Sequence, residues 1–438
     1  MTPDDDPTQL LAELIRFDTT NPPGNEKACV AHLADRLTDA GLDTTLLAAD
    51  PDRPNLIARL SGRGEAPPLL LYGHVDVVTT AHQDWAHPPC AGRVVDGWIW
   101  GRGALDMKGA VAMMTTAVLR AAKRGLTPAG DVLLAFVADE EAGGKAGARF
   151  LVEEYPETFG GAKYAIGEFG GVPIHVAGRR FYAIQVAEKQ PCWLEVTLRG
   201  PGGHGARPMR GGAMAALGRI LSDLDRGRTP IHVTPVARRM IASIADEVGG
   251  VKGVVLRRLL NRRLTDRLLR LLGTSGAQLE PLFRNTVNAT TVRGGEKGNV
   301  IPTEIALGLD GRILPGFGPE DLIGEIRDLT KVPFEPRILL HDPSTAETDL
   351  GLFDTLAGIL RELDPGTPSF PLLLPGSTDA RFFDRLGIQT YGFTPMNLPH
   401  DFDFFSTIHA ADERVPCKAI EFGTQAIGAL LERYGASG

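Results

Sequence analysis

The chain is poor in cysteine, in aromatic residues and in long apolar runs. Its 438 residues include 4 cysteines that lie far apart and form no CxxC pair, so neither a disulfide framework nor a cysteine zinc site is expected. No apolar run approaches the roughly 20 residues of a membrane helix, and the chain starts MTPDDDPTQL, without a basic leader. These features predict a cytoplasmic protein.

The chain also lacks an excess of positive charge. Its formal net charge is -8, which argues against nucleic acid or an anionic membrane as a partner. The share of hydrophobic residues, 43%, and of charged residues, 23%, is that of a globular protein. A chain of this length is expected to fold as about two domains.

Helical periodicity alternates with short apolar runs in the first part of the chain. The expected helices are Thr8–Phe17, Lys27–Ala40, Gly109–Arg124 and Gly147–Tyr155, and the expected strands are Leu69–Tyr72, Val132–Ala138 and Tyr164–Ile166. This alternation predicts an α/β fold with a mainly parallel sheet sandwiched by helices.

The pattern changes near Glu188. The segments WLEVTLRG (193–200) and IALGLDGRIL (Ile305–Leu314) alternate apolar and polar residues, as the strands of a half-buried antiparallel sheet do. After Asp342 the mixed pattern returns, with a helix at Leu350–Leu363, a strand at Gln389–Phe393 and a helix at Lys418–Tyr434. We therefore expect a domain of residues 1–187 and 343–438, interrupted by an inserted α+β domain of residues 188–342.

The segment Pro235–Phe283 is rich in leucine and arginine. Its basic helical stretches favour helices that pack on the inserted domain with their arginine side chains in water. The alternative is a lipid-binding surface, which predicts liposome binding that is lost at moderate salt.

Acidic residues and histidines follow the expected parallel strands, at the edge of the sheet where such folds bind ligands. They are His74 and Asp76 after the first strand, Asp139, Glu140 and Glu141 after the second, and Glu168 after the third. Two more candidates, Asp106 and His409, each precede a helix. Two histidines with three carboxylates suit two borderline metal ions such as Zn²⁺. Without metal, such a carboxylate cluster would repel itself and protonate in part.

Six motifs together carry a family resemblance. They are GHVDVV, GRGALDMKG, ADEEAGG, PGGHGARP, NVIP and HAADERV. In order and approximate spacing they resemble the dinuclear zinc metallopeptidases that include aminoacylase-1, carboxypeptidase G, acetylornithine deacetylase and succinyl-diaminopimelate desuccinylase. The resemblance implies an α/β domain of the zinc exopeptidase type and an inserted lid and dimerisation domain of four antiparallel strands and two helices.

The resemblance implies a site with two Zn²⁺ ions, which Co²⁺ or Mn²⁺ could replace. His74 and Glu168 would hold one ion, Glu141 and His409 the other, and Asp106 would bridge both. The resemblance also implies a cis peptide bond between Asp106 and Met107.

Further roles follow from the same resemblance. Asp76 would orient the His74 imidazole. Glu140 would be the general base that accepts the proton of a metal-bridging water, so that the resulting hydroxide attacks the amide. His204 would reach into the site of a partner subunit, so we expect a homodimer.

Two residues of the inserted domain, Asn299 and Arg312, would hold the carboxylate of the substrate. Arg381, in the segment GSTDARFF, lies in a family loop near the site and is a further candidate for substrate binding. The length of the segment 235–283 resembles the branch of N-acyl-amino-acid hydrolases that act on larger, lipophilic acyl groups.

The expected function is hydrolysis of the amide bond of an N-acyl amino acid or a small peptide with a free carboxylate. A dipeptidase or carboxypeptidase with the same site is the alternative within enzymes. A non-catalytic protein that binds an amino-acid derivative is disfavoured, because all five metal ligands and the base are present.

Overall fold

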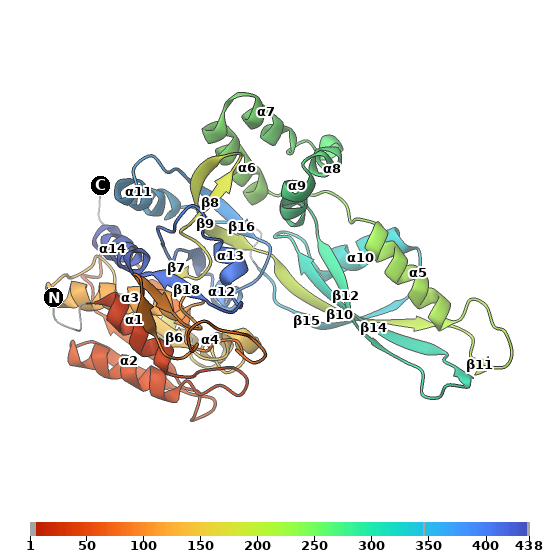
Figure 1. Ribbon diagram of the computed structural model, residues 1–438, viewed down its shortest axis with the longest axis horizontal. Helices are drawn as coiled ribbons and strands as arrows, with labels where there is room; N and C mark the ends of the chain where they lie inside the picture. The colour runs from red at the N-terminus through yellow and green to blue at the C-terminus, as the bar shows by residue number, and fades with distance from the viewer. Residues whose placement is uncertain (1–5, 345–346, 436–438) are drawn as a thin grey trace. The chain divides into compact units, whose positions relative to one another are not determined.

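The computed structural model describes residues 6–344 and 347–435. The chain divides into two compact units, and the second interrupts the first in the sequence (Figure 1). Unit 1 consists of Met1–Val186, Asp349–Leu372 and Thr378–Gly438, and unit 2 consists of Ala187–Thr348 and Leu373–Ser377.

Unit 1 is built on a mixed sheet with the strand order β1-β2-β6-β3-β7-β17-β9-β16, in which β8 also pairs with β9. The central strands β6, β3, β7 and β17 run parallel, and the pairs β1–β2, β2–β6, β17–β9 and β8–β9 are antiparallel. The strands are β1 (Asp43–Leu47), β2 (Asn55–Leu60), β3 (Leu69–His74), β6 (Val132–Val137), β7 (Tyr164–Gly167), β8 (Val172–Val176), β9 (Arg179–Glu188), β16 (Ser369–Leu374) and β17 (Gln389–Gly392). The expected α/β fold class is confirmed.

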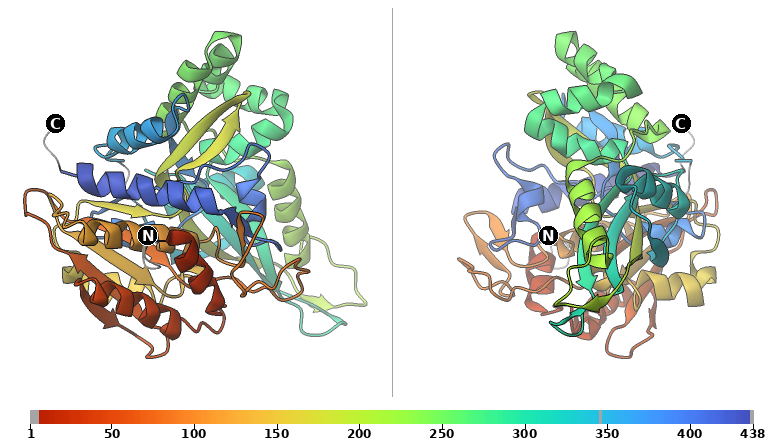
Figure 2. Two further views of the ribbon diagram at one scale, coloured as in Figure 1. Left: turned by 60° about the vertical axis from the view of Figure 1, so that its left-hand side comes forward. Right: turned by 90° about the vertical axis from the view of Figure 1, so that its right-hand side faces the viewer.

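Helices cover this sheet because its central strands are apolar on both faces. Every residue of β3 and β6 is buried, as expected for parallel strands between two helix layers. The helices α1 (Pro7–Arg16), α3 (Lys108–Lys123), α11 (Phe353–Leu363) and α14 (Cys417–Arg433) form one group (Figure 2). The shorter helices α4 (Ala148–Glu154) and α12 (Ala380–Asp384) pack against Leu70, Tyr72 and Leu133. Helix α2 (Lys27–Asp39) lies against β1 and β2.

A small sheet in unit 1 joins segments that are far apart in the sequence. Its strands are β4 (Arg93–Val95), β5 (Trp98–Trp100) and β18 (Arg414–Pro416). Strand β5 pairs antiparallel with both neighbours, so that Arg414 lies opposite Trp100. The short helix α13 (Phe404–Thr407) precedes β18.

Unit 2 contains an antiparallel sheet with the strand order β12-β14-β10-β15. The strands are β10 (Gln190–Arg199), β12 (Thr286–Arg293), β14 (Glu304–Ile313) and β15 (Glu335–His341), and a two-stranded ribbon consists of β11 (Gly203–His204) and β13 (Val300–Ile301). Alternate residues of β10, such as Leu194 and Val196, are buried against α5 (Ala213–Arg226) and α10 (Pro319–Thr330). The alternation in the sequence thus predicted the covered face of the sheet.

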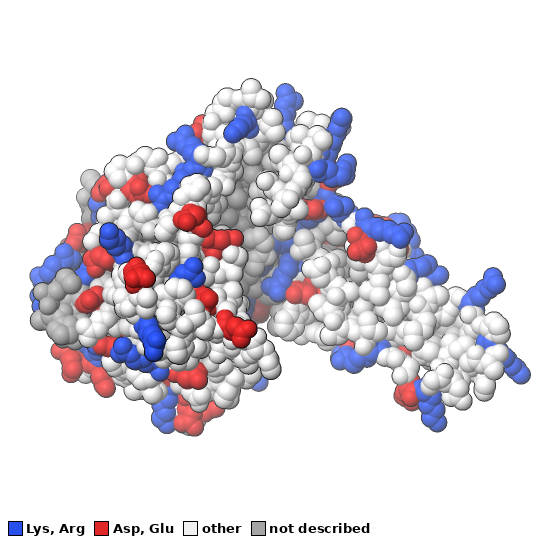
Figure 3. Space-filling model, viewed as in Figure 1, with Lys and Arg blue, Asp and Glu red and all other residues white. Residues whose placement is uncertain are grey.

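The arginine-rich segment forms the helices α6 (Pro235–Val248), α7 (Gly250–Arg258), α8 (Arg262–Leu271) and α9 (Gly273–Leu279). Met240 and Leu269 are buried, whereas Arg263, Arg267 and Arg270 are exposed. Figure 3 shows Lys and Arg side chains gathered on the surface over these helices. The favoured interpretation, packed helices with arginines in water, agrees with this arrangement. Among the described residues, no helix is long and apolar enough to cross a membrane.

Lys189 is a fully buried lysine in unit 2. Its Nζ donates hydrogen bonds to the carbonyl of Arg284 and to Oγ1 of Thr286, both at 2.9 Å. Burial, together with the charge of Arg312, lowers the pKa of Lys189 to about 7. In an unfolded chain the pKa of lysine is about 10.4.

We therefore predict that Lys189 makes unfolding depend on pH. Between about pH 7 and 10 the unfolded chain binds a proton at this residue that the native chain does not, so stability rises with pH over this window. Lys189→Met removes this contribution. The melting temperature of the wild type should rise relative to that of the variant between pH 7 and 9. Identical pH profiles of the two proteins would contradict the assignment.

Candidate metal centre

Three neighbouring strands of unit 1 deliver acidic groups and a histidine to one edge of the sheet. In the strand register, His74 lies opposite Val137, and Leu71 lies opposite Ile166. The strands β6, β3 and β7 therefore end side by side. Their ends carry His74 on β3, the 3₁₀ turn Glu140–Ala142 after β6, and Glu168 after β7.

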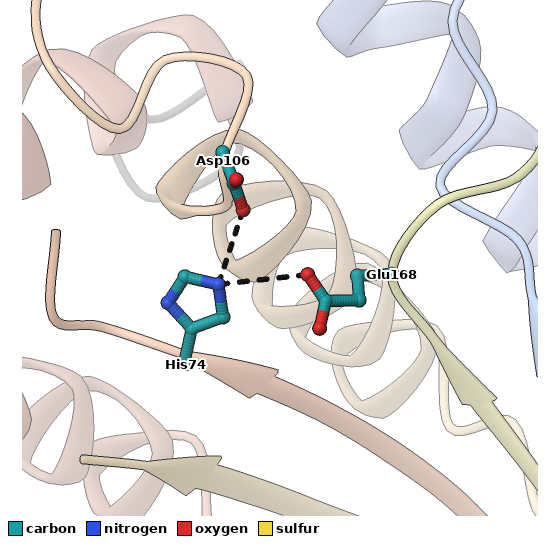
Figure 4. Close-up of side chains that lie close together, drawn as sticks. All are labelled: His74, Asp106 and Glu168. Atoms are coloured by element: carbon teal, nitrogen blue, oxygen red, sulfur yellow. Dashed lines mark hydrogen bonds and ion pairs between the residues drawn. The ribbon is translucent and has the colours of Figure 1, made fainter. Parts of the chain in front are cut away.

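The first ligand group consists of His74, Asp106 and Glu168 (Figure 4). His74 Nε2 lies 3.1 Å from Asp106 Oδ1 and 3.6 Å from Glu168 Oε2. All three side chains are buried. Glu168 Oε1 has no hydrogen-bond partner within the described part of the chain. A buried carboxylate oxygen without a donor is costly, and a cation at this place would satisfy it.

The second ligand group consists of Asp106, Glu141 and His409. His409 Nε2 lies 3.2 Å from Asp106 Oδ2 and 3.2 Å from Glu141 Oε1. His409 has a left-handed backbone, with φ of 62°, and its side chain is 47% exposed. This group is therefore more open to water than the first.

Asp106 belongs to both groups and presents a different oxygen to each. It precedes α3, and its peptide bond to Met107 is cis, which confirms the expectation drawn from the resemblance. The position of Asp106 between two histidines is the one that a bridging carboxylate requires.

The carboxylates and histidines of the two groups shift one another's pKa values. Burial raises the pKa of Asp106, but hydrogen bonds with His409 and His74 outweigh it and hold the pKa well below its usual range. Hydrogen bonds with Asp106 and Glu141 raise the pKa of His409 to about 10. Burial raises the pKa of Glu168 to about 7, although His74 opposes the shift. The histidines thus hold protons where ligands of a metal would have to release them.

Asp76 organises the turn that carries Glu140 and Glu141. Its Oδ1 accepts a hydrogen bond from the backbone N–H of Glu140, and its Oδ2 accepts one from that of Glu141, both at 3.1 Å. His74 Nδ1 instead bonds to the backbone carbonyl of Asp76 at 3.0 Å, and the carboxylate Oδ1 lies at 3.6 Å. In this conformation, Asp76 therefore orients the imidazole through its main chain.

Glu140 lies in the same turn and is partly buried. Burial raises its pKa well above the usual value, and the nearby Glu168 carboxylate raises it further. Glu140 thus has a raised proton affinity and lies beside the two ligand groups. A carboxyl group of this kind is suited to proton transfer.

Arg381 supports this turn from α12. It donates hydrogen bonds to the carbonyl of Thr378 at 2.8 Å and to that of Gly143 at 3.4 Å. Its guanidinium carbon lies 4.4 Å from the centre of the Phe382 ring, and the residue is buried. These contacts support the loop after Glu141, and the substrate-binding role of Arg381 stays a prediction.

Three buried or partly buried residues near the turn were missed. Asn21 donates to Asp76 Oδ2 at 2.9 Å, and Arg53 donates to Asp139 Oδ1 at 2.8 Å and pairs with buried Glu26. Isolated polar residues in the loops before β2 carry no sequence signal of such a role.

Asp379 was also missed, although it lies only two residues before Arg381 in the segment GSTDARFF. It is buried, and neither carboxylate oxygen has a hydrogen-bond partner within the residues described. Burial raises its pKa to about 6.

The remaining expected residues lie in unit 2. His204 and Asn299 are neighbours at the ribbon β11–β13, where His204 pairs with Val300, and both are exposed. Arg312 lies near the opposite end of β14, where it bonds to Asp310 at 2.8 Å and to Ser377 at 3.2 Å. Asn299 and Arg312 are thus not brought together within unit 2.

The arrangement in unit 1 is that of a metal-dependent hydrolase, with acid, base and ligand groups at the end of a parallel sheet. The model of peptidase family M20/M25/M40 matches residues 70–433, and the chain belongs to this family. It is therefore a hydrolase of this peptidase family.

Relatives and solved structures agree with this assignment. The chain is 29% identical to a succinyl-diaminopimelate desuccinylase of Paracoccus denitrificans (strain Pd 1222) over 100% of both chains. It is 26% identical to aminoacylase-1 of Sus scrofa, over 96% of this chain and 94% of the relative. The M20 family metallo-carboxypeptidase Sso-CP2 from Sulfolobus solfataricus has the same fold. Its TM-score is 0.68 at 17% identity, with coverage of 97% of this chain and 98% of that one.

Proposed function

We propose that the protein is a dinuclear zinc amidohydrolase that cleaves N-acyl amino acids or small peptides with a free carboxylate. The observation that carries the proposal is the position of Asp106, which offers one oxygen to His74 and Glu168 and the other to Glu141 and His409. Nitrogen and carboxylate oxygen are the donors that Zn²⁺ accepts, and Co²⁺ or Mn²⁺ suits the same set.

His74, Asp106 and Glu168 would hold one ion, and Asp106, Glu141 and His409 the other. Two bound zinc ions would polarise the scissile carbonyl and lower the pKa of water at the site. The chain supplies the remaining functions, which are to orient the ligands, to move the proton and to hold the substrate.

Glu140 is the proposed general base. Its turn is fixed by Asp76 and by the adjacent ligand Glu141, so its carboxyl group is held beside the reacting centre. Glu140 accepts the proton of the attacking water and delivers it to the departing amine, which cannot leave as an anion.

Substrate contacts are proposed for unit 2. Arg312 has the planar donors that bind a carboxylate in bidentate fashion. His204 and Asn299 are exposed neighbours at the ribbon, which suits groups that act on the site of a second copy of the chain. A homodimer with shared sites follows from this assignment.

A substrate panel tests the proposed function. The zinc-loaded protein should release free amine from N-acetyl, N-succinyl or long-chain N-acyl amino acids, or from dipeptides. The C-terminal amide of each substrate is the matched control, and its kcat/KM should be lower by about 10² or more, because a carboxylate partner is lost. The preferred members of the panel separate a deacylase from a dipeptidase. Release of no amine from any member by the metal-loaded protein would refute the proposal.

We predict that Glu140→Gln abolishes most turnover and spares binding. The amide keeps the shape of the side chain but cannot accept the proton, so kcat should fall by about 10²–10⁴. KM and zinc content should change little. A variant that keeps most of its activity, or that loses its metal, would show that the roles of Glu140 and Glu141 are assigned wrongly.

Shared sites predict complementation between two inactive variants. His204→Ala leaves the metal centre intact, and Glu140→Gln leaves His204 intact. A mixture that exchanges subunits should therefore regain about one quarter of the wild-type activity, because half of the dimers contain one complete site. A fully active His204→Ala protein, or no recovery after proven subunit exchange, would contradict this mechanism.

A further inference from the structure

An ion pair buried in unit 1 lies behind the proposed centre. Arg102 follows β5 and is 2% exposed, and Glu413 precedes β18 and is 0% exposed. The pairing of β5 with β18 brings the two residues together. Arg102 Nη1 lies 2.6 Å from Glu413 Oε2.

Glu413 holds the backbone of the bridging ligand. Its Oε1 accepts hydrogen bonds from the N–H of Leu105 at 2.8 Å and from the N–H of Asp106 at 3.3 Å. The carboxylate of Glu413 therefore fixes the main chain from which the Asp106 side chain projects.

Arg102 holds the backbone at His409. Its Nη2 donates to the carbonyl of His409 and its Nη1 to that of Ala410, both at 3.1 Å. Gln83 adds a second donor to the His409 carbonyl at 2.9 Å, and its own Oε1 accepts from Arg102 Nη2 at 2.8 Å.

These contacts matter because His409 belongs to no helix or strand. It lies between the end of α13 at Thr407 and the start of β18 at Arg414. By contrast, His74 is the last residue of β3, and Glu168 follows β7 directly, so the sheet register sets their separation.

We propose that Arg102 and Glu413 form a positioning clamp that sets the separation of Asp106 and His409 and thereby builds the second ligand group. The inference rests on the proposed dinuclear centre and deepens it. Neither residue touches the reacting groups. Loosening the clamp weakens the group of Asp106, Glu141 and His409 more than the group held by the sheet, so the two metal sites become unequal.

Glu413→Gln tests the clamp. The amide oxygen can still accept from the N–H groups of Leu105 and Asp106. The NH₂ group, however, replaces the oxygen that pairs with Arg102, so the ion pair is lost and two donors face each other. The matched control is Glu421→Gln, which breaks the pair between Arg120 and Glu421 that joins α3 and α14 with two contacts of 2.8 Å. Each metal-free protein is titrated with Zn²⁺ against a chromophoric chelator, and circular dichroism checks its fold.

We expect two tight sites in the wild type and in Glu421→Gln. In Glu413→Gln one site should stay within about threefold of the wild type, and the other should weaken by about 10- to 100-fold, the usual effect of removing a support of a ligand. The visible spectrum of the Co²⁺-loaded variant should show the second ion binding at higher concentration. Gln83→Ala, a partly exposed residue, should weaken the same site by a smaller factor, and serves if Glu413→Gln does not fold.

The results of the titrations distinguish failure of the proposed clamp from failure of the proposed dinuclear centre. A wild type that binds fewer than two ions refutes both. A wild type with two tight sites refutes the clamp alone if Glu413→Gln and Gln83→Ala leave both affinities unchanged, or weaken both sites equally.

Discussion

The candidate site depends on one constraint: the negative charge of carboxylates buried at one edge of the sheet has to be offset by protons or by cations. Asp106 and Glu168 are buried beside His74, and Glu140 lies close enough to Glu168 for its pKa to rise. Hydrogen bonds with Asp106 and Glu141 raise the pKa of His409 to about 10, and burial raises that of Glu168 to about 7, so protons held at the site offset part of this negative charge. A divalent cation that binds must displace those protons, so metal affinity and proton affinity are linked at this site.

Two carboxylates, those of Asp76 and Glu413, hold the candidate ligands in place in the same way, by accepting hydrogen bonds from backbone N–H groups. Asp76 uses its two carboxylate oxygens to fix the N–H groups of Glu140 and Glu141, and Glu413 uses one oxygen to fix those of Leu105 and Asp106. Each buried carboxylate fixes the main chain at a candidate ligand. This limits how far the ligand can move when the charge at the site changes. Strand register provides the same rigidity for His74 and Glu168.

The sequence predicted most of the fold and the two groups of candidate metal ligands, but not the buried carboxyl group of Asp379 beside them. Apolar runs such as Leu69–Tyr72 identify buried parallel strands, and the polar residues after them must gather at one edge, whatever the details of packing. Strand β1 was missed because Asp43–Leu47 is exposed on most residues and has no apolar pattern. Polar supports such as Arg53, and the contacts of Arg102 and Glu413, depend on long-range packing, which neither periodicity nor local motifs encode. The contacts of Arg381 show the same limit, since its hydrogen bond to Gly143 depends on packing between α12 and the loop after Glu141.

The most direct test is to locate the metal in crystals of the zinc-loaded protein by anomalous scattering at the zinc absorption edge. The account predicts two peaks about 3.5–4 Å apart, one against His74 and Glu168 and one against Glu141 and His409, with one oxygen of Asp106 on each. A single peak in fully loaded crystals, or two peaks that Asp106 does not join, would contradict it.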